Sequence, residues 1–138
     1  MPATARSRSR QTVLVVDDEP VIVRLLDAIL RKNRFDVITA STGEQALEEF
    51  RDRSTKICLL IVDITLTGPM SGFEFVDHLP TLRPRIPVLF TTRLGELEIE
   101  CKVPPNCDLL QKPFTPEQLM HWVNVAVSLG QPPSWPAE

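Results

Sequence analysis

Five short runs of strand-forming residues recur along this chain and restrict its fold more than any other feature. The runs are Thr12–Val16, Phe35–Ala40, Lys56–Val62, Pro87–Thr91 and Asp108–Gln111. The first and the third lack the alternation of apolar and polar residues that a strand with one solvent-exposed face shows. They are therefore typical of strands that are covered on both faces, as in a parallel sheet.

Segments with helical periodicity separate most of these runs. Apolar residues recur at helical spacing from Val21 to Leu30, and Pro20 is suited to a first helical turn. Strands that alternate with helices predict an α/β fold with a parallel sheet and right-handed crossovers. Capping boxes are predicted at the starts of three further helices: Ser41 with Glu44, Ser71 with Glu74, and Thr115 with Gln118.

The segment from Leu94 to Asn106 departs from this alternation. A helix is expected there, but Pro104 and Pro105 limit it to about two turns, from Gly95 to Lys102. We therefore expect a short or irregular fourth helix.

The 138 residues suit one folded domain, which we place at 11–130. A Ser/Arg-rich, basic arm at 1–10 and a proline-rich tail at 131–138 are expected to be disordered. No run approaches the roughly 18 apolar residues of a membrane span, and no apolar segment follows the basic N-terminus as in a secretory signal. A net charge of −3 gives no general attraction to nucleic acid or to anionic membranes.

Three cysteines without CxxC spacing argue against a disulfide framework or a zinc site. Free thiols fit a reducing compartment, so a cytoplasmic location is expected.

Five polar residues follow directly on the predicted strands. Asp17 and Asp18 follow the first run, Asp63 the third, Thr92 the fourth and Lys112 the fifth. Ligands of open α/β sheets bind outside the carboxyl ends of the strands, so these side chains are predicted to converge. Three neighbouring carboxylates repel one another unless a cation lies among them, and oxygen ligands alone favour Mg²⁺.

This set of residues suits phosphoryl transfer. A carboxylate can act as the nucleophile that forms an acyl phosphate. Lys112 can pair with the phosphate, and the Thr92 hydroxyl can donate to one of its oxygens. Positioning and charge neutralisation are most of what such a transfer requires from a protein.

Five motifs, in this order and spacing, resemble the receiver domain of two-component response regulators. They are VLVVDDEP at 13–20, LLIVDITL at 59–66, PMSGFE at 69–74, PVLFTT at 87–92 and LLQKPF at 109–114. The resemblance covers about residues 12–130. It implies a flavodoxin-like, doubly wound (βα)5 fold with the strand order 2-1-3-4-5.

The resemblance also implies a role for each residue of the site. Asp63 would be the phosphoacceptor, and Asp18 and Asp63 would bind Mg²⁺ directly. Asp17 would bind the ion through water, and the backbone carbonyl of Thr65 would be a further ligand.

Two more roles follow from the same resemblance. Thr92 would be the switch hydroxyl and Lys112 the phosphate-pairing lysine, with a cis peptide bond between Lys112 and Pro113.

The chain departs from the family pattern in several places. Thr67 stands where the family often has proline, and the loop from Asp63 to Gly72 is one residue longer than the commonest form. Arg93 replaces the small Ala or Gly that usually follows the switch threonine, so a long side chain there is expected to crowd the pocket or to pair with the phosphate. Leu109 occupies the position of the family's switch aromatic residue.

These features predict a stand-alone response regulator in a Mg²⁺-dependent phosphorelay. The phosphoryl donor would be a sensor histidine kinase or a phosphotransfer protein. No DNA-binding domain follows in this sequence, so output is expected through a protein partner or a homodimer. Phosphotransfer and self-dephosphorylation would be the only reactions, without enzymatic turnover of a substrate.

Two alternatives remain open. Arg93, Leu109 and the irregular segment also fit a pseudo-receiver, an interaction module that does not depend on phosphorylation. A phosphatase of the haloacid-dehalogenase type would likewise use an aspartyl nucleophile and Mg²⁺, but it requires a DxD motif that Asp17-Asp18-Glu19 lacks. Incubation with Mg²⁺ and acetyl phosphate or beryllofluoride would distinguish these functions.

Overall fold

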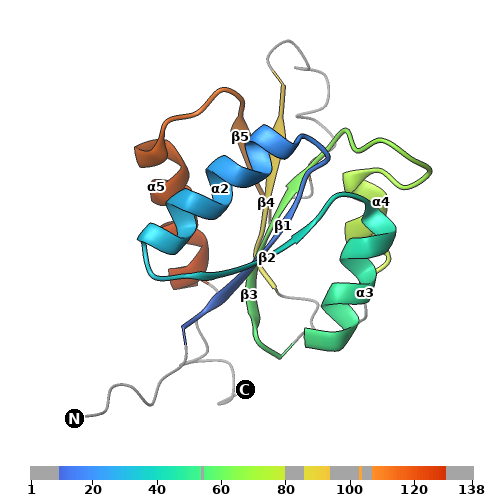
Figure 1. The fold of residues 1–138 in the computed structure, drawn as a ribbon, viewed down its shortest axis with the longest axis horizontal. Coiled ribbons are helices and arrows are strands. Elements are labelled where there is room, and N and C mark those ends of the chain that lie inside the picture. Colours follow the sequence, from blue (N-terminus) through green and yellow to red (C-terminus); the bar gives the residue numbers. More distant parts are fainter. Residues whose placement is uncertain (1–9, 54, 80–85, 94–102, 104–106, 130–138) are drawn as a thin grey trace.

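A computed structural model describes residues 10–53, 55–79, 86–93, 103 and 107–129. Along the chain its elements are β1 (Thr12–Val16), α2 (Pro20–Lys32), β2 (Asp36–Ala40), α3 (Gly43–Arg53), β3 (Ile57–Asp63), α4 (Gly72–Asp77), β4 (Val88–Thr92), β5 (Asp108–Gln111) and α5 (Pro116–Leu129). The five strands form one parallel sheet in the order β2-β1-β3-β4-β5 (Figure 1). The predicted flavodoxin-like fold is confirmed.

Helices cover both faces of the sheet. The helices α3 and α4 cover one face, and α2 and α5 cover the other (Figure 1), each pair with its own core of apolar side chains. Neighbouring residues of one strand therefore enter different cores: Leu14 and Leu60 pack in the core of α3 and α4, whereas Val13 and Leu59 pack in the core of α2 and α5. Because both faces are buried, the central strands need apolar residues at every position, which explains the continuous runs in the sequence.

The starts of the helices agree with the sequence in all but one case. Pro20 occupies the first turn of α2, and the boxes of Ser71 with Glu74 and of Thr115 with Gln118 are present. The predicted box of Ser41 with Glu44 is wrong. It is the hydroxyl of Thr42 that accepts from the backbone N–H of Gln45, while the Gln45 side chain accepts from the backbone N–H of Ser41. The cap is thus displaced by one residue, since α3 begins at Gly43.

The ends of the strands differ from prediction by one residue. Phe35 precedes β2, because its N–H closes the end of α2 by donating to the carbonyl of Leu30. Asp63 and Thr92 are the last residues of β3 and β4 rather than the first residues of loops. Their backbones are therefore held by the sheet, which positions the two side chains.

Some predictions fall on residues that the structure does not describe. The helix predicted from Gly95 to Lys102 lies outside the described residues, as do residues 1–9 of the arm and 131–138 of the tail. Within the described part of the chain, no helix combines the length and the apolar character needed to cross a membrane.

Candidate functional site

Three carboxylates meet at the carboxyl edge of the sheet. Asp17 and Asp18 follow β1, and Asp63 ends β3, which pairs with β1 through Val16 and Val62. One oxygen from each carboxylate lies within 4.8 Å of the others. Asp17 and Asp63 are buried, and Asp18 is half-buried. The predicted convergence of these three residues is therefore observed.

Asp18 carries the feature that points to a cation. Its Oδ2 accepts a hydrogen bond of 2.9 Å from the backbone N–H of Thr67. Its Oδ1 is buried without a hydrogen-bond partner among the described residues. A buried oxygen without a partner is unfavourable, and a bound cation would satisfy it. Because the group offers carboxylate oxygens and no nitrogen or sulfur, it suits Mg²⁺.

Asp63 is held from two sides. Its Oδ1 accepts from the backbone N–H of Thr65 at 3.1 Å and from the Thr65 hydroxyl at 3.4 Å, and its Oδ2 lies 3.3 Å from Nζ of Lys112. Burial raises the pKa of Asp63 from 3.8 to about 6, opposed by the charge of Lys112 and reinforced by that of Asp17. The carboxyl group thus remains mostly ionised at neutral pH, although its charge is poorly solvated.

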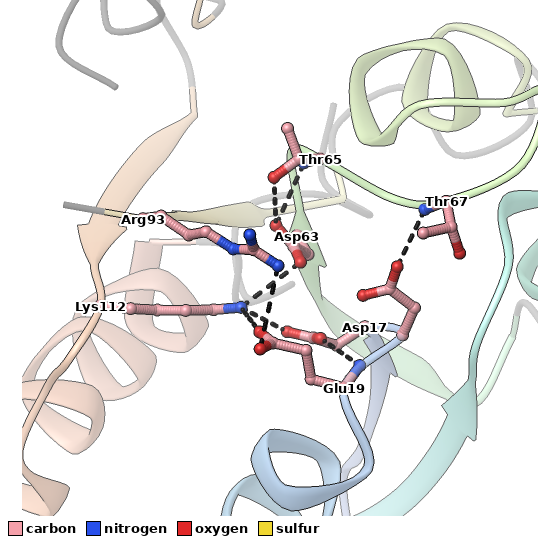
Figure 2. Close-up of polar contacts among 8 residues, drawn as sticks. Asp17, Glu19, Asp63, Thr65, Thr67, Arg93 and Lys112 are labelled. Carbon is pink, nitrogen blue, oxygen red and sulfur yellow. Dashed lines mark hydrogen bonds and ion pairs between the residues drawn. The ribbon is translucent and has the colours of Figure 1, made fainter. Parts of the chain in front are cut away.

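Lys112 joins the acidic residues together (Figure 2). Its buried Nζ donates to Asp17 at 2.9 Å, to Glu19 at 3.0 Å and to Asp63 at 3.3 Å. Burial favours the neutral amine, but the hydrogen bonds to Asp17 and Glu19 and the charge of Asp63 outweigh it, so the pKa of Lys112 is raised above 10.5. The ammonium therefore stays charged.

The backbone around Lys112 brings in Thr92. The N–H of Lys112 donates to the carbonyl of Thr92 at 2.7 Å, and the Lys112–Pro113 peptide bond is cis, as predicted. Thr92 is buried at the end of β4, next to the strand that carries Asp63. The structure therefore brings all five predicted side chains to one edge, with Thr65 beside them. The chemical roles of these residues and of the Thr65 carbonyl stay predictions.

Glu19 belongs to the site although the sequence did not identify it. It occupies the cap position of α2, yet its side chain makes no cap hydrogen bond. Instead Oε1 accepts from Lys112 at 3.0 Å, and Oε2 lies 3.8 Å from a guanidinium nitrogen of Arg93. The signal in the sequence was a third acidic residue directly before Pro20, which is also compatible with an ordinary cap.

Gly72 allows α4 to begin directly against Asp63. Its N–H donates to the carbonyl of Ile64 at 3.0 Å. A Cβ at this position would lie 2.2 Å from the backbone oxygen of Asp63, closer than real Cβ atoms approach. The longer loop after Asp63 thus returns to the sheet at a point where only glycine fits without a shift of the backbone.

Comparison with known proteins agrees with this geometry. Residues 13–124 match the family model described as the response regulator receiver domain. The chain is 33% identical over 116 residues to the two-component response regulator ORR26 of Oryza sativa subsp. japonica, covering 82% of this chain and 20% of that protein. It is 35% identical over 112 residues to PhoP, the alkaline phosphatase synthesis transcriptional regulatory protein of Bacillus subtilis (strain 168), covering 78% of this chain and 44% of PhoP.

A solved structure extends the similarity to the fold. The crystal structure of a putative response regulator from Chloroflexus aurantiacus J-10-fl superimposes with a TM-score of 0.77 at 26% identity, covering 87% of this chain and 99% of that one. By contrast, the chain spans less than half the length of the two regulators from rice and Bacillus.

Proposed function

This chain belongs to the response regulator receiver domain family, and we propose that it accepts a phosphoryl group on Asp63 in a Mg²⁺-dependent phosphorelay. The donor is a phosphohistidine of a sensor histidine kinase or of a phosphotransfer protein. The observation that carries the proposal is the position of Asp63, which is buried, has a carboxylate oxygen within 4.8 Å of one from Asp18, and lies 3.3 Å from the ammonium of Lys112.

The transfer requires an ionised Asp63. One of its carboxylate oxygens attacks phosphorus, and the P–O bond forms as the P–N bond to the imidazole breaks, leaving that electron pair on the ring nitrogen. The Lys112 ammonium, charged because of its acidic neighbours, pairs with the oxygens of the transferred group. Mg²⁺ held by Asp18 and Asp63, with the Thr65 carbonyl and a water on Asp17, would neutralise further negative charge on that group.

The reverse step is hydrolysis. Water attacks the phosphorus, the bond to Asp63 breaks, and inorganic phosphate leaves as the carboxylate is restored. The chain thus goes through one phosphorylation and one dephosphorylation per signal, without turnover of a separate substrate. Output runs through contact with a protein partner or with a second copy of the chain, in the cytoplasm.

Intact-mass measurement after incubation with Mg²⁺ and acetyl phosphate tests the proposal. We expect the mass of one phosphoryl group on the parent chain and none on Asp63→Asn. Asp52→Asn is the matched control, because Asp52 is an exposed residue of α3. Equal labelling of the parent and Asp63→Asn, or no labelling of the parent, would contradict the proposal. The second of these results would favour a pseudo-receiver.

Phosphotransfer from purified histidine kinases and phosphotransfer proteins tests the choice of donor. Transfer of radiolabelled phosphate to the parent, but not to Asp63→Asn, is the expected result.

A further inference from the structure

Arg93 extends over the site from the end of β4, where the family usually has a small residue. In Figure 2 its side chain points into the same space as Lys112 and Asp63. Its guanidinium lies 3.8 Å from Glu19, which also accepts from Lys112, and Lys112 in turn lies 3.3 Å from Asp63. A series of ion pairs therefore connects Arg93 to Asp63, the residue that is proposed to accept the phosphoryl group.

Glu19 holds two cations at once. Its two carboxylate oxygens face different partners: Oε1 faces Lys112, and Oε2 faces Arg93. The contact with Lys112 is short and partly buried. The contact with Arg93 is long, and the two side chains are 56% and 41% exposed. An ion pair of this kind contributes little, so the contact with Glu19 itself holds the guanidinium only weakly.

We infer that Arg93 is a second phosphate-binding residue of this site, kept near the pocket by Glu19 and paired with the phosphoryl oxygens when Asp63 is modified. The inference rests on the proposed function. A guanidinium presents its N–H donors in a planar fork that matches two phosphate oxygens. Such charge-assisted hydrogen bonds are stronger than the exposed ion pair with Glu19 at 3.8 Å. Lys112, buried and bonded to Asp17, supplies the fixed positive charge, and Arg93 supplies the movable one.

Beryllofluoride binding in the presence of Mg²⁺, followed by fluorine NMR, measures this pairing without phosphoryl transfer. We expect Arg93→Ala to bind beryllofluoride about tenfold more weakly than the parent, because the variant loses about one charge-assisted hydrogen bond to the anion. Mg²⁺ alone should bind Arg93→Ala at least as tightly, because a nearby positive charge is removed. Arg93→Lys, which keeps the charge but not the fork, should fall between the two.

Arg53→Ala is the matched control. Arg53 lies in α3, 3.8 Å from Glu49, and its side chain is 53% exposed, so the length of its ion pair and its exposure match those of Arg93. It should bind beryllofluoride like the parent. The same weakening in Arg53→Ala as in Arg93→Ala would overturn the inference.

The Glu19→Gln background separates direct binding from an effect through Glu19. If Arg93 contacts the anion, Arg93→Ala weakens beryllofluoride binding in this background as well. If Arg93 acts only by holding Glu19, the effect of Arg93→Ala disappears there, and the inference is wrong. Failure of the parent itself to bind beryllofluoride would refute the proposed function and this inference together, whereas equal binding by parent and Arg93→Ala would refute the inference alone.

Discussion

The ammonium nitrogen of Lys112 lies 2.9 Å from Oδ2 of Asp17, although 95 positions separate the two residues along the chain. The contact links the loop after β5 to the loop after β1. In the sheet, β3 and β4 lie between these two strands. It places a buried positive charge among buried negative ones. Both the stability of the site and its chemistry depend on this balance.

Replacement of Lys112 by methionine should destabilise the metal-free protein. The charges of Asp17 and Asp63 would then be buried without their cation, which costs about 3 kcal/mol. Urea unfolding in EDTA measures the loss. Lys56→Met, at an exposed position, serves as the control. A midpoint for Lys112→Met equal to that of the control would show that the buried charges are compensated in another way.

The stability of the metal-free protein should depend on pH through Asp63. The pKa of this carboxyl group is raised by burial from 3.8 to about 6, so the folded state holds the proton more tightly than the unfolded state. The resulting stabilisation is complete below pH 3.8 and is lost as the pH rises to about 6.

Asp63→Asn, which has no such proton to lose, should therefore be more stable than the parent above pH 6. About two pKa units correspond to about 3 kcal/mol, and the advantage should vanish toward pH 4. Calorimetric melting in EDTA across this range measures the difference. An advantage that does not change with pH would be inconsistent with a raised pKa.

Asp18→Asn should weaken Mg²⁺ binding at least tenfold. The substitution removes the negative charge of the Asp18 carboxylate, whose Oδ1 has no hydrogen-bond partner among the described residues. The asparagine oxygen can still accept from the backbone N–H of Thr67. The melting temperature of the metal-free variant should consequently not fall below that of the parent. Mg²⁺ titration followed by calorimetry provides the measurement, and Asp27→Asn, on α2 and paired with Arg31, provides the control. Unchanged affinity in Asp18→Asn would exclude Asp18 as a ligand.

Gly72→Ala should destabilise the fold by about 2 kcal/mol and weaken beryllofluoride binding, because the new Cβ would press on the Asp63 backbone. Gly68 offers a contrast. It has a φ of 98°, but apart from its own backbone and its chain neighbours no described atom lies within 4 Å of an added Cβ, so Gly68→Ala should cost about 1 kcal/mol in backbone strain alone. Chemical denaturation and beryllofluoride binding together separate the two effects. Loss of beryllofluoride binding in Gly68→Ala rather than in Gly72→Ala would contradict the role given to Gly72.

The adjacent Thr91 and Thr92 should respond differently to valine. The Oγ1 of Thr91 is buried without a hydrogen-bond partner among the described residues, so Thr91→Val should raise stability by about 1 kcal/mol and leave labelling by acetyl phosphate unchanged. Thr92→Val should reduce labelling, because it removes the hydroxyl that is proposed to donate a hydrogen bond to a phosphate oxygen. Thermal melting and intact mass report the two effects. Destabilisation by Thr91→Val would reveal a hydrogen bond to its hydroxyl.

Much of the fold could be predicted because local patterns agree with the final architecture. Continuous apolar runs identified strands that are buried on both faces, and the boxes at Ser71 and Thr115 identified two helix starts. The box predicted at Ser41 was wrong because Thr42, the next residue, offers an equally suitable hydroxyl. Sequence alone cannot choose between adjacent caps when the packing of the helix decides where it begins.

By itself, the sequence determined that the polar residues at the carboxyl ends of the strands lie together. Parallel strands end at one edge of a sheet, so residues that follow strands must meet there, as Asp17, Asp63 and Lys112 do. Only the tertiary structure decided how they meet. The side chain of Glu19 contacts Lys112 and Arg93 instead of capping α2. The burial of Asp63 raises the pKa of its carboxyl group. The directions of side chains and the solvation of charges depend on neighbours that are distant in sequence, and no local pattern specifies them.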